Sequence, residues 1–518
     1  MYRPRTIFLL VLLPLLWGAV PSHASDNPGM PSASAIESLF AGPGDLTIAG
    51  RHLNRGPLET FYEKRGFRPV WNADLRAQLD AALADAPSHG LDPGAFAVPP
   101  ADPARSELLM TDAFLRYANA LGRGRVNPSQ FETDWVIPAP NVDVIQALNR
   151  APSDGVGPAL AALAPTDSGY DRLRQAYARY KDYVHAQAWK PIALAMPLRP
   201  GDNGADVVTL RQRLAAEGFA IDAASPEFDS SLADAVTRFQ VARGLPGDGN
   251  IGRATLTALN ISPGERMREI RLNLERWRLL PRERPASRVE VNVADPSAVL
   301  FADGAPALTM RVVVGTIDHP TPVLRARMSA VLLNPPWIIP FSIIQNEIRP
   351  AIKADPDYLA KNDMVYVDVN GGQQLQQRPG AKNALGKIKF EMPNGLDIYL
   401  HDTSAPLVFG RSRRALSHGC VRVDNPRELA RLVLAADPKW QMDAIDAAIA
   451  AGKTVSVPLP HAIPVYIFYW TAYVDTDGTV EFRDDVYSRD KRLNQALIQR
   501  DQGEQLTPAR AGLAPGQG

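Results

Sequence analysis

Two stretches in the C-terminal half of this sequence carry most of its information: IYLHDT at residues 398–403 and ALSHGCVR at residues 415–422. Apolar residues in the first stretch predict a short strand that ends at His401. A loop follows, and a tight Ser-His-Gly turn then presents Cys420. One short region of the chain therefore holds a cysteine, two histidines and a glycine around a turn.

Cys420 is the single cysteine of the sequence. Because structural cysteines in oxidising compartments usually come in pairs, an unpaired one there is either an inert core residue or a reactive thiol. Acyl transfer at a cysteine needs a base for the thiol proton and N–H donors for the oxyanion. The imidazole of His401 or His418 can serve as the base, and Gly419 lets the backbone approach the reacting oxygen. These residues predict a cysteine nucleophile but do not decide which histidine acts on it.

The two stretches together resemble the signature of the L,D-transpeptidase (YkuD-type) catalytic domain: a histidine, a loop, Ser/Thr-His-Gly-Cys, an apolar residue and Asn or Arg. Here fifteen residues separate His401 from Ser417, and Cys420 is followed by Val and Arg. VVVG at 312–315 and NALG at 383–386 also resemble this family. The resemblance implies that Cys420 is the nucleophile and His401 its general base, with no cofactor. The other histidines have no metal-ligand spacing, so no metal site is expected.

The resemblance implies further roles around Cys420. Gly419 and Cys420 would supply N–H donors to the oxyanion. Arg422 would pair with a substrate carboxylate, because a guanidinium forks onto two oxygens, or would support the turn through a salt bridge. Asp402 or a backbone carbonyl would orient His401, unless Asp402 only caps the local turn. Residues expected to line the site are Tyr399, Ser417, His418, Arg422 and Trp337, and His418 is also a candidate catalytic residue; for Trp337, core packing is the alternative.

Residues 196–262 resemble a second family, the small three-helix peptidoglycan-binding domain. The segment GDNGADVVTL at 201–210 begins the unit. FQ at 239–240, GL at 244–245 and DG at 248–249 then follow at positions that match that family. The resemblance covers the whole unit and implies three short helices.

The other parts of the chain form a scaffold, a catalytic domain and an insertion. Residues 26–190 have mainly helical patterns and, with GLDP at 90–93 and RGRV at 123–126, resemble the scaffold region of large Gram-negative L,D-transpeptidases. Residues 285–490 have strand patterns and are expected to form the catalytic domain. The long insertion at 338–385 is expected to be a helical capping subdomain. The expected fold class is α+β: a helical scaffold and a three-helix unit, then a mainly antiparallel β catalytic domain with an inserted helical cap.

Four local patterns predict secondary structure or its absence. Residues 26–50, rich in Ser, Pro, Gly and Ala, predict a mobile lead-in. Residues 137–165, interrupted by Pro and Gly, predict a connection. Asp477 and Gly478 lie between two apolar segments and predict a β-hairpin. Residues 498–518 are polar and small and are expected to be a disordered tail.

The N-terminus has the pattern of an export signal. Arg3 and Arg5 precede an apolar run, and SHA at 22–24 supplies the small residues that a signal peptidase requires. Residues 1–24 are therefore expected to be a cleaved signal peptide. The alternative is an uncleaved membrane anchor, but the apolar run is shorter than a span requires. The expected location is the periplasm, with no stable membrane span.

The charge balance limits the class of partner. Lys plus Arg and Asp plus Glu both number 56, so the formal net charge is zero. This argues against nucleic acid, because phosphate-binding proteins usually carry a basic surplus. The expected partners are peptidoglycan stem peptides as donor and acceptor, with other cell-wall synthesis proteins as further candidates.

The resemblance implies a reaction in two steps. Cys420 would attack the carbonyl at the L-centre of residue three in a tetrapeptide stem, and D-Ala would leave. The side-chain amine of residue three on a second stem would then take the acyl group, which forms a 3→3 cross-link. The alternatives are a cysteine hydrolase or carboxypeptidase, attachment of a lipoprotein to the same polymer, and a non-catalytic wall-binding protein. An intact His401 and Cys420 favour an enzyme over the last of these.

Overall fold

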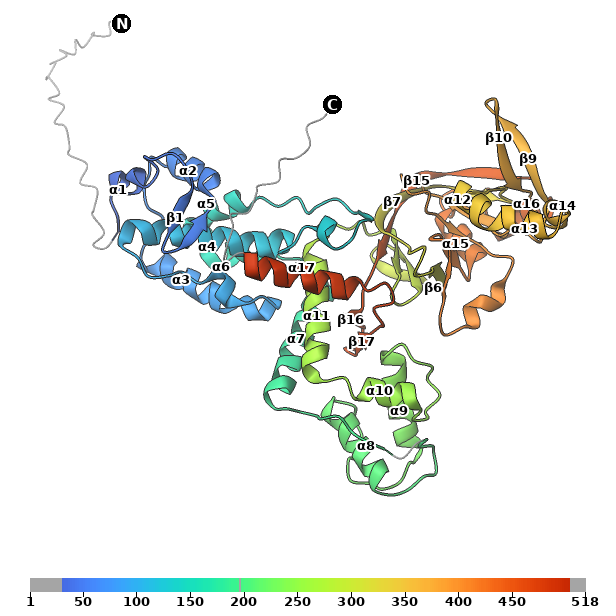
Figure 1. Cartoon of the computed structure of the whole chain (residues 1–518), viewed down its shortest axis with the longest axis horizontal. Helices are drawn as coiled ribbons and strands as arrows, with labels where there is room; N and C mark the ends of the chain where they lie inside the picture. The colour runs from blue at the N-terminus through green and yellow to red at the C-terminus, as the bar shows by residue number, and fades with distance from the viewer. Residues whose placement is uncertain (1–29, 195–196, 504–518) are drawn as a thin grey trace, which may run out of the picture.

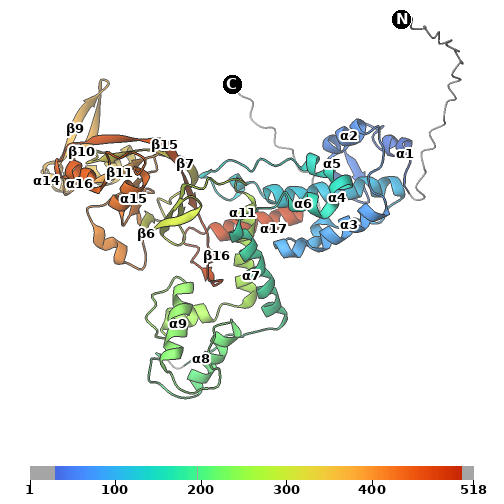
Figure 2. The same cartoon turned by 180° about the vertical axis from the view of Figure 1, so that it is seen from behind.

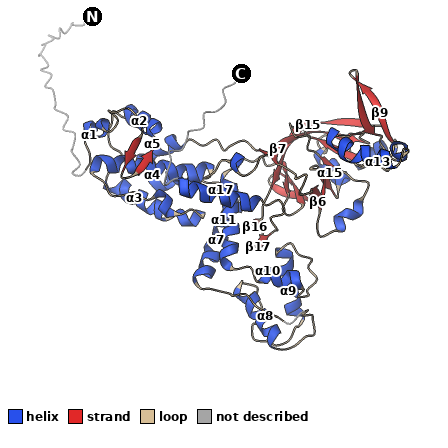
Figure 3. Cartoon of the chain, in the orientation of Figure 1, coloured by secondary structure: helices blue, strands red, loops and turns tan. Residues whose placement is uncertain are grey.

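The computed structural model describes residues 30–194 and 197–503, so the predicted signal peptide at 1–24 lies outside the described residues. The described chain forms three lobes around a pair of long helices (Figure 1), and the reverse view shows the same arrangement (Figure 2). Two lobes are helical, and the third holds most of the strands (Figure 3). The predicted α+β fold class is therefore confirmed. Within the residues that the structure describes, no helix has the length and apolar character needed to cross a membrane.

The N-terminal lobe is built around the helix α4 (Pro103–Arg123). The carboxylate of Asp102 caps the start of this helix by accepting the N–H of Arg105. Leu108, Phe114 and other apolar residues of α4 are fully buried against the surrounding helices. These helices are α1 (Ala33–Ser38), α2 (Arg55–Lys64), α3 (Ala73–Ala84), α5 (Val144–Asp154) and α6 (Val156–Ala161).

Two predictions for this lobe are wrong. From Met30 onward, the predicted mobile lead-in is ordered structure: α1 buries Ile36 in the core, and a hairpin of β1 (Leu46–Ile48) and β2 (Arg51–Leu53) follows. The predicted connection at residues 137–165 contains α5 and α6. Pro152 lies near the end of α5, where it costs few helical hydrogen bonds. Gly155 then takes a φ of 90°, which lets the chain begin a second helix instead of a loop.

The long helices α7 (Ser168–His185) and α11 (Pro263–Arg278) lie side by side at the centre of the molecule (Figure 1). Tyr170 and Leu173 of α7 and Ile270 of α11 belong to the same buried cluster as the strands of the third lobe. The second lobe lies between these helices in sequence and consists of α8 (Ala205–Ala216), α9 (Ser230–Ala242) and α10 (Arg253–Leu259). It has its own core, which includes Leu210 and Phe239.

The third lobe is a closed sheet. Its strands follow the order β11-β12-β14-β6-β5-β4-β15-β7, and β7 also pairs with β11, which completes the ring. The pairs β12–β14 and β4–β15 are parallel, and the other neighbours in the ring are antiparallel. The strands are β4 (Arg288–Asn292), β5 (Ser297–Ala302), β6 (Ala305–Gly315), β7 (Val323–Leu333), β11 (Ile388–Glu391), β12 (Leu400–His401), β14 (Val421–Val423) and β15 (Val455–Phe468).

The insertion between β7 and β11 folds as a small unit with its own apolar core of Ile339, Ile343, Ile348, Met364 and Leu375. It is not purely helical as predicted. Its Gln-rich stretch forms β10, which pairs with β9 and β8 in a three-stranded sheet. The elements are β8 (Trp337–Ile338), α12 (Phe341–Ile343), a π-helical turn (Ile344–Ile348), α13 (Arg349–Ala354), α14 (Tyr358–Lys361), β9 (Met364–Val369) and β10 (Gly372–Gln377).

After β15, the described part of the chain returns toward the N-terminal lobe. The predicted hairpin at Asp477-Gly478 is confirmed as β16 (Ala472–Val474) paired with β17 (Val480–Phe482). Helix α17 (Arg489–Gly503) then contacts α11 (Figure 1), and its Asp501 pairs with Arg125 just beyond the end of α4 (2.5 Å). This corrects the start of the predicted disordered tail, because residues 498–503 are helical and the apolar side of the helix is anchored by Leu493 and Leu497. Residues 504–518 lie outside the described residues.

Candidate active site

The sheet brings most of the predicted site residues to one face. Strands β12 and β14 run parallel, with Leu400 beside Val421 and His401 beside Arg422. Leu400 and Val421 are fully buried in the core. Because side chains alternate between the two faces of a sheet, the neighbouring positions face the other way. The residues on that opposite face are Tyr399 and His401 from one strand and Cys420 and Arg422 from the other.

The turn before Cys420 is held by its own serine. The Ser417 hydroxyl donates to the Cys420 carbonyl oxygen (2.6 Å) and accepts the N–H of Gly419 (3.2 Å). Gly419 has a φ of 111°, a left-handed conformation that favours glycine. Ser417 is only 2% exposed, so it shapes the turn instead of lining the site as the sequence predicts.

The hydrogen bonds of this turn decide which of the two predicted oxyanion donors is available. The N–H of Gly419 is already used by the Ser417 hydroxyl, and its carbonyl accepts the Thr321 hydroxyl (2.7 Å). The N–H of Cys420, in contrast, makes no hydrogen bond with any residue that the structure describes. Of the two predicted donors, Cys420 is therefore the one whose N–H is available.

Cys420 is half-buried, and burial raises the pKa of its thiol. The backbone N–H and hydroxyl of Tyr399 and the charge of Lys389 partly oppose this rise, because they stabilise a thiolate. The thiol itself donates to the carbonyl oxygen of Asp397 over 3.6 Å. At rest, the sulfur is therefore protonated and surrounded by groups that favour its ionised form.

His401 is 4% exposed, and burial is the main reason why the pKa of its imidazole falls to about 3; the charge of Arg422 adds to the effect. The ring is therefore neutral at neutral pH. Its Nδ1 atom is buried and makes no hydrogen bond with any described residue. The backbone carbonyls of Asp402 and Leu385 partly oppose the fall in the pKa of His401, because they favour the protonated ring. The imidazole, on the same face of the sheet as the thiol, is thus in the neutral form that a general base requires.

Asp402 caps the local turn, which is the second of the two roles predicted for it. Its carboxylate accepts the backbone N–H groups of Lys387 and Thr403, both over 2.7 Å. The backbone at Gly386 runs very close to Asp402, since a Cβ on Gly386 would lie 2.4 Å from the Asp402 carboxylate. Asp402 thus caps the turn after His401, and neither of these hydrogen bonds goes to the imidazole.

Two aromatic residues connect the insertion to the nucleophile. The Tyr399 side chain interacts with both the Trp337 side chain and the Cys420 sulfur. Trp337 also packs against the apolar core of the insertion. Lys389, which the sequence prediction left out of the site, lies 4.3 Å from the centre of the Tyr399 ring and pairs with Glu391 (3.0 Å). Its position on β11 beside His401 could have been recognised only from strand pairing.

His418 faces the insertion. Its Nε2 lies 2.6 Å from a carboxylate oxygen of Glu347 in the π-helical turn, and its ring lies 5.1 Å from that of His319. Both members of the Glu347–His418 pair are exposed. Sequence analysis missed Glu347 and His319, because nothing in the local pattern near either residue indicates a contact with a turn so distant in sequence.

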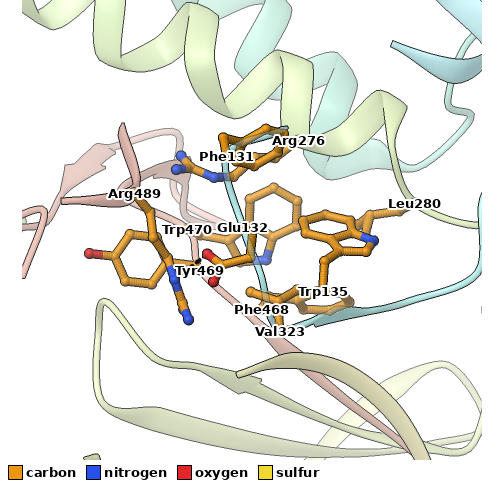
Figure 4. A pocket seen from close by; sticks show the side chains of 10 residues that line it. All are labelled: Phe131, Glu132, Trp135, Arg276, Leu280, Val323, Phe468, Tyr469, Trp470 and Arg489. Atoms are coloured by element: carbon orange, nitrogen blue, oxygen red, sulfur yellow. Dashed lines mark ion pairs between the residues drawn. The ribbon is translucent and has the colours of Figure 1, made fainter. Parts of the chain in front are cut away.

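A small pocket lies elsewhere, at the joint between the lobes. Figure 4 shows side chains from five separate segments of the chain converging on it, including Glu132, Arg276 and Arg489. Glu132 and Arg489 form a buried ion pair there. None of the predicted site residues lines this pocket, so its features belong to the packing of the lobes. Among the described residues, no group of three His, Cys, Asp or Glu side chains is placed to hold a metal ion.

Three family models match the chain. The L,D-transpeptidase catalytic domain (YkuD) matches residues 286–457, which contain the Cys420 site. The scaffold domain matches residues 56–176. The family described as "Putative peptidoglycan binding domain" matches residues 203–259. The resemblances predicted from sequence are therefore confirmed at the level of domain families.

Parts of this chain are also similar to individual proteins and solved structures. A Haemophilus influenzae protein named "Putative L,D-transpeptidase" is 31% identical over 279 residues, which are 50% of this chain. The match spans 56% of that relative. An L,D-transpeptidase structure from Xylanimonas cellulosilytica is 16% identical and covers 54% of this chain and 100% of its own, with a TM-score of 0.18. One from Stackebrandtia nassauensis is 13% identical and covers 54% and 97%, with a TM-score of 0.22.

Proposed function

Since residues 286–457 carry an L,D-transpeptidase catalytic domain, we propose that this chain forms 3→3 cross-links between peptidoglycan stem peptides through an acyl-enzyme on Cys420. The observation that carries the proposal is the strand register, which places Cys420 and His401 on one face of the sheet inside the matched domain. The peptidoglycan-binding match at residues 203–259 supports the same polymer as substrate. An enzyme of this kind would work outside the cytoplasm, in the periplasm, where other cell-wall synthesis proteins would be candidate partners.

In the first step, the Cys420 sulfur attacks the carbonyl carbon of residue three of a donor stem. The thiol proton moves to the neutral imidazole of His401, so that the sulfur acts as a thiolate only while the bond forms. This requires the S–H to rotate away from the Asp397 carbonyl. The Cys420 N–H is the donor that we assign to the developing oxyanion. The intermediate then collapses: the C–N bond breaks, the leaving amine takes the proton from His401, and a thioester remains.

In the second step, the side-chain amine of residue three on an acceptor stem attacks the thioester. His401 takes a proton from the attacking nitrogen and returns it to the sulfur as the C–S bond breaks. The new amide is the cross-link, and the enzyme is regenerated. If water takes the place of the amine, the same residues hydrolyse the thioester, so the balance between cross-linking and hydrolysis depends on the access of the acceptor.

The decisive experiment is mass spectrometry of purified protein incubated with a disaccharide-tetrapeptide. We expect release of D-Ala and formation of a 3→3 dimer by the wild type, and neither by Cys420→Ala. His401→Asn should abolish turnover as well, whereas the matched change at an exposed histidine, His185→Asn, should not. D-Ala release with only tripeptide product would indicate a hydrolase. Absence of turnover and of any adduct on Cys420 in the wild type would refute the enzymatic proposal and favour wall binding.

A further inference from the structure

The nucleophile turn has one backbone group that its own hydrogen bonds do not use. The N–H of Gly419 and the carbonyl oxygen of Cys420 are both hydrogen-bonded to the Ser417 hydroxyl. The carbonyl oxygen of Gly419 accepts the Thr321 hydroxyl (2.7 Å). Among the N–H and carbonyl groups of Gly419 and Cys420, the Cys420 N–H alone makes no hydrogen bond with a residue that the structure describes. The direction of this N–H therefore decides whether it reaches an oxyanion.

Thr321 sets that direction. The Gly419 carbonyl and the Cys420 N–H belong to one planar trans peptide unit, so they point in opposite directions. A hydrogen bond that holds the carbonyl toward Thr321 therefore holds the N–H pointing away from it. A threonine hydroxyl has a single proton to donate. The Thr321 hydroxyl accepts the N–H of Gly315 (2.8 Å), which leaves that proton for the Gly419 carbonyl.

Thr321 is in turn held from the scaffold side. It is fully buried in the connection between β6 and β7. Its carbonyl oxygen accepts a hydrogen bond from the guanidinium of Arg489 at the start of α17 (3.0 Å). Arg489 forms its buried ion pair with Glu132, which lies within the matched scaffold domain. A continuous series of contacts thus runs from Glu132 through Arg489 and Thr321 to the peptide unit that carries the free N–H.

We propose that Thr321 is a positioning residue that directs the Cys420 N–H toward the oxyanion, and that the scaffold domain holds Thr321 in place through the Glu132–Arg489 pair. The inference rests on the proposed function and adds to it the contacts that orient the oxyanion donor. Such a donor acts where charge develops on the oxygen, so its orientation affects the transition state more than substrate binding. These residues should therefore affect kcat and not KM.

The variant Thr321→Val tests the first contact, because it removes the hydroxyl and keeps the shape of the side chain. Release of D-Ala from the disaccharide-tetrapeptide is measured by mass spectrometry. We expect kcat to fall by about tenfold to a hundredfold with KM nearly unchanged, as for a misdirected oxyanion donor. Thr321→Ser keeps the hydroxyl and should retain most of the wild-type kcat. Alkylation of Cys420 by iodoacetamide forms no oxyanion, so its rate should stay at the wild-type value in both variants.

Thr111→Val is the matched control, in the core of the N-terminal lobe. Like Thr321, Thr111 is fully buried. Its hydroxyl also donates to a backbone carbonyl, that of Glu107 (3.0 Å), and accepts an N–H, that of the Trp71 indole (2.8 Å). Both variants should lose stability, because each leaves buried polar groups unpaired. Only Thr321→Val should lower kcat, so an equal loss of turnover by both would indicate general destabilisation and overturn the inference.

Arg489→Lys tests the link to the scaffold domain, because it keeps a charge beside Glu132 without the fork that also reaches Thr321. It should lower kcat by less than Thr321→Val does. In the Thr321→Val background it should change kcat little further, because both changes act through the same contact. Glu132→Gln should show the same non-additivity. Fully additive effects on kcat would mean that the pair does not act through Thr321 and would overturn the inference.

The inference is also overturned if Thr321→Val retains the wild-type kcat, or if it slows alkylation and turnover by the same factor. Each of these results would leave the proposed function standing, because the wild type still turns over the substrate. Failure of the wild type to release D-Ala would overturn the proposed function and this inference together.

Discussion

At the scale of single residues, the site is built to keep its nucleophile and base uncharged at rest. Burial raises the pKa of the Cys420 thiol and lowers that of the His401 imidazole to about 3, so transfer of a proton between them at rest is unfavourable. Such a pair differs from a preformed thiolate–imidazolium pair, in which the cysteine would react at low pH. The charge separation is instead created during attack on the substrate, where the oxyanion donor can stabilise it.

This arrangement predicts the pH dependence of thiol alkylation. Since only the thiolate reacts and the thiol pKa is raised, the rate of modification of Cys420 by iodoacetamide should rise about tenfold per pH unit between pH 6 and pH 8. No inflection from His401 should appear in that range, because its pKa is about 3. The rate is measured by intact-protein mass spectrometry. A pH-independent rate between pH 5 and pH 7 would show a preformed ion pair and contradict the interpretation.

The variant His401→Asn provides the control for that measurement. Because a neutral imidazole contributes no charge to the resting thiolate, the alkylation profile of this variant should resemble that of the wild type, while turnover of the peptide substrate is lost. Tyr399→Phe, in contrast, should change the rate of alkylation. It removes a hydroxyl that stabilises the thiolate, so alkylation at pH 7 should slow, by roughly threefold to tenfold for one lost hydrogen bond.

At the scale of elements, the contact between the insertion and the nucleophile turn is polar and exposed. Glu347 and His418 are in contact at 2.6 Å, but their side chains are 49% and 42% exposed. Such a pair contributes under about 1 kcal/mol. The insertion also has its own core, so it does not depend on this pair to fold. The geometry therefore allows the insertion to move relative to the turn at a small cost in free energy.

We expect Glu347→Gln to raise amide hydrogen exchange in residues 341–354 and in the turn at 417–420, by less than about fivefold, with an unchanged unfolding midpoint. Asp355→Asn is the matched control, because Asp355 pairs with Lys361 inside the insertion (2.8 Å) and does not contact the turn. Exchange is measured by mass spectrometry. Equal effects of both variants on residues 417–420 would mean that the Glu347–His418 pair does not connect the two elements.

What the sequence predicts correctly at this scale depends on local patterns. The hairpin at Asp477-Gly478 is found because its turn residues and flanking strands are contiguous in sequence. The strand ending at His401 is found for the same reason. The Gln-rich strand β10 is missed, because Leu375 is its only apolar side chain, so the segment lacks the apolar alternation that predicts a strand. Glu347 is missed because its contact with His418 depends on tertiary structure alone.

The site shows the same division between local and tertiary information. The motif identifies Cys420 and both histidines as candidates, since these residue types and their spacing are visible in sequence. It does not show that the Ser417 hydroxyl is turned inward, or that the Gly419 N–H is already bonded. It also does not place Lys389 beside His401, because that neighbour comes from the pairing of β11 with β12. Strand pairing is a property of the closed sheet and not of any one segment.

At the scale of the whole molecule, buried charged networks join the lobes. The carboxylate of Glu217, 2% exposed at the end of α8, accepts hydrogen bonds from Tyr180 of α7 (3.0 Å) and from Arg243 beyond α9 (2.6 Å). Arg213 pairs with its other oxygen (2.9 Å). Arg243 also donates to the carbonyl oxygen of Val480 in β17 (3.0 Å). Through Arg243, one carboxylate thus connects the three-helix unit to the central helix and to the β16–β17 hairpin.

We expect Glu217→Gln to lower the free energy of unfolding by about 3 to 5 kcal/mol, because it leaves two buried guanidinium groups without a counter-charge. Urea denaturation followed by tryptophan fluorescence measures the change. The control is Glu428→Gln, which breaks the partly exposed pair with Arg431 and should cost under about 1 kcal/mol. Similar losses for the two variants would show that the Glu217 network does not hold the lobes together.

A second buried network, at the joint of the N-terminal lobe with α7 and α11, predicts a pH dependence of stability. His89 is 7% exposed, and its Nδ1 lies 2.8 Å from the Tyr170 hydroxyl. Burial, followed by the charges of Arg174 and Arg278, lowers the pKa of His89 to about 3. An unfolded histidine titrates near pH 6.5. Between about pH 6.5 and pH 3 the unfolded chain therefore binds a proton that the folded chain does not, and acidification through this window destabilises the fold.

The size of this effect can be isolated by comparing variants. Each pH unit below about 6.5 should cost the wild type roughly 1.4 kcal/mol at His89. His89→Asn loses its hydrogen bond at every pH, but it no longer loses this further stability on acidification. The difference in unfolding free energy between wild type and variant should therefore shrink by about 2 kcal/mol from pH 6.5 to pH 5, as measured by urea denaturation. The matched variant His185→Asn changes an exposed ring and should show a constant difference. A constant difference for His89→Asn as well would mean that His89 becomes protonated in the folded protein, and that the joint accommodates its charge.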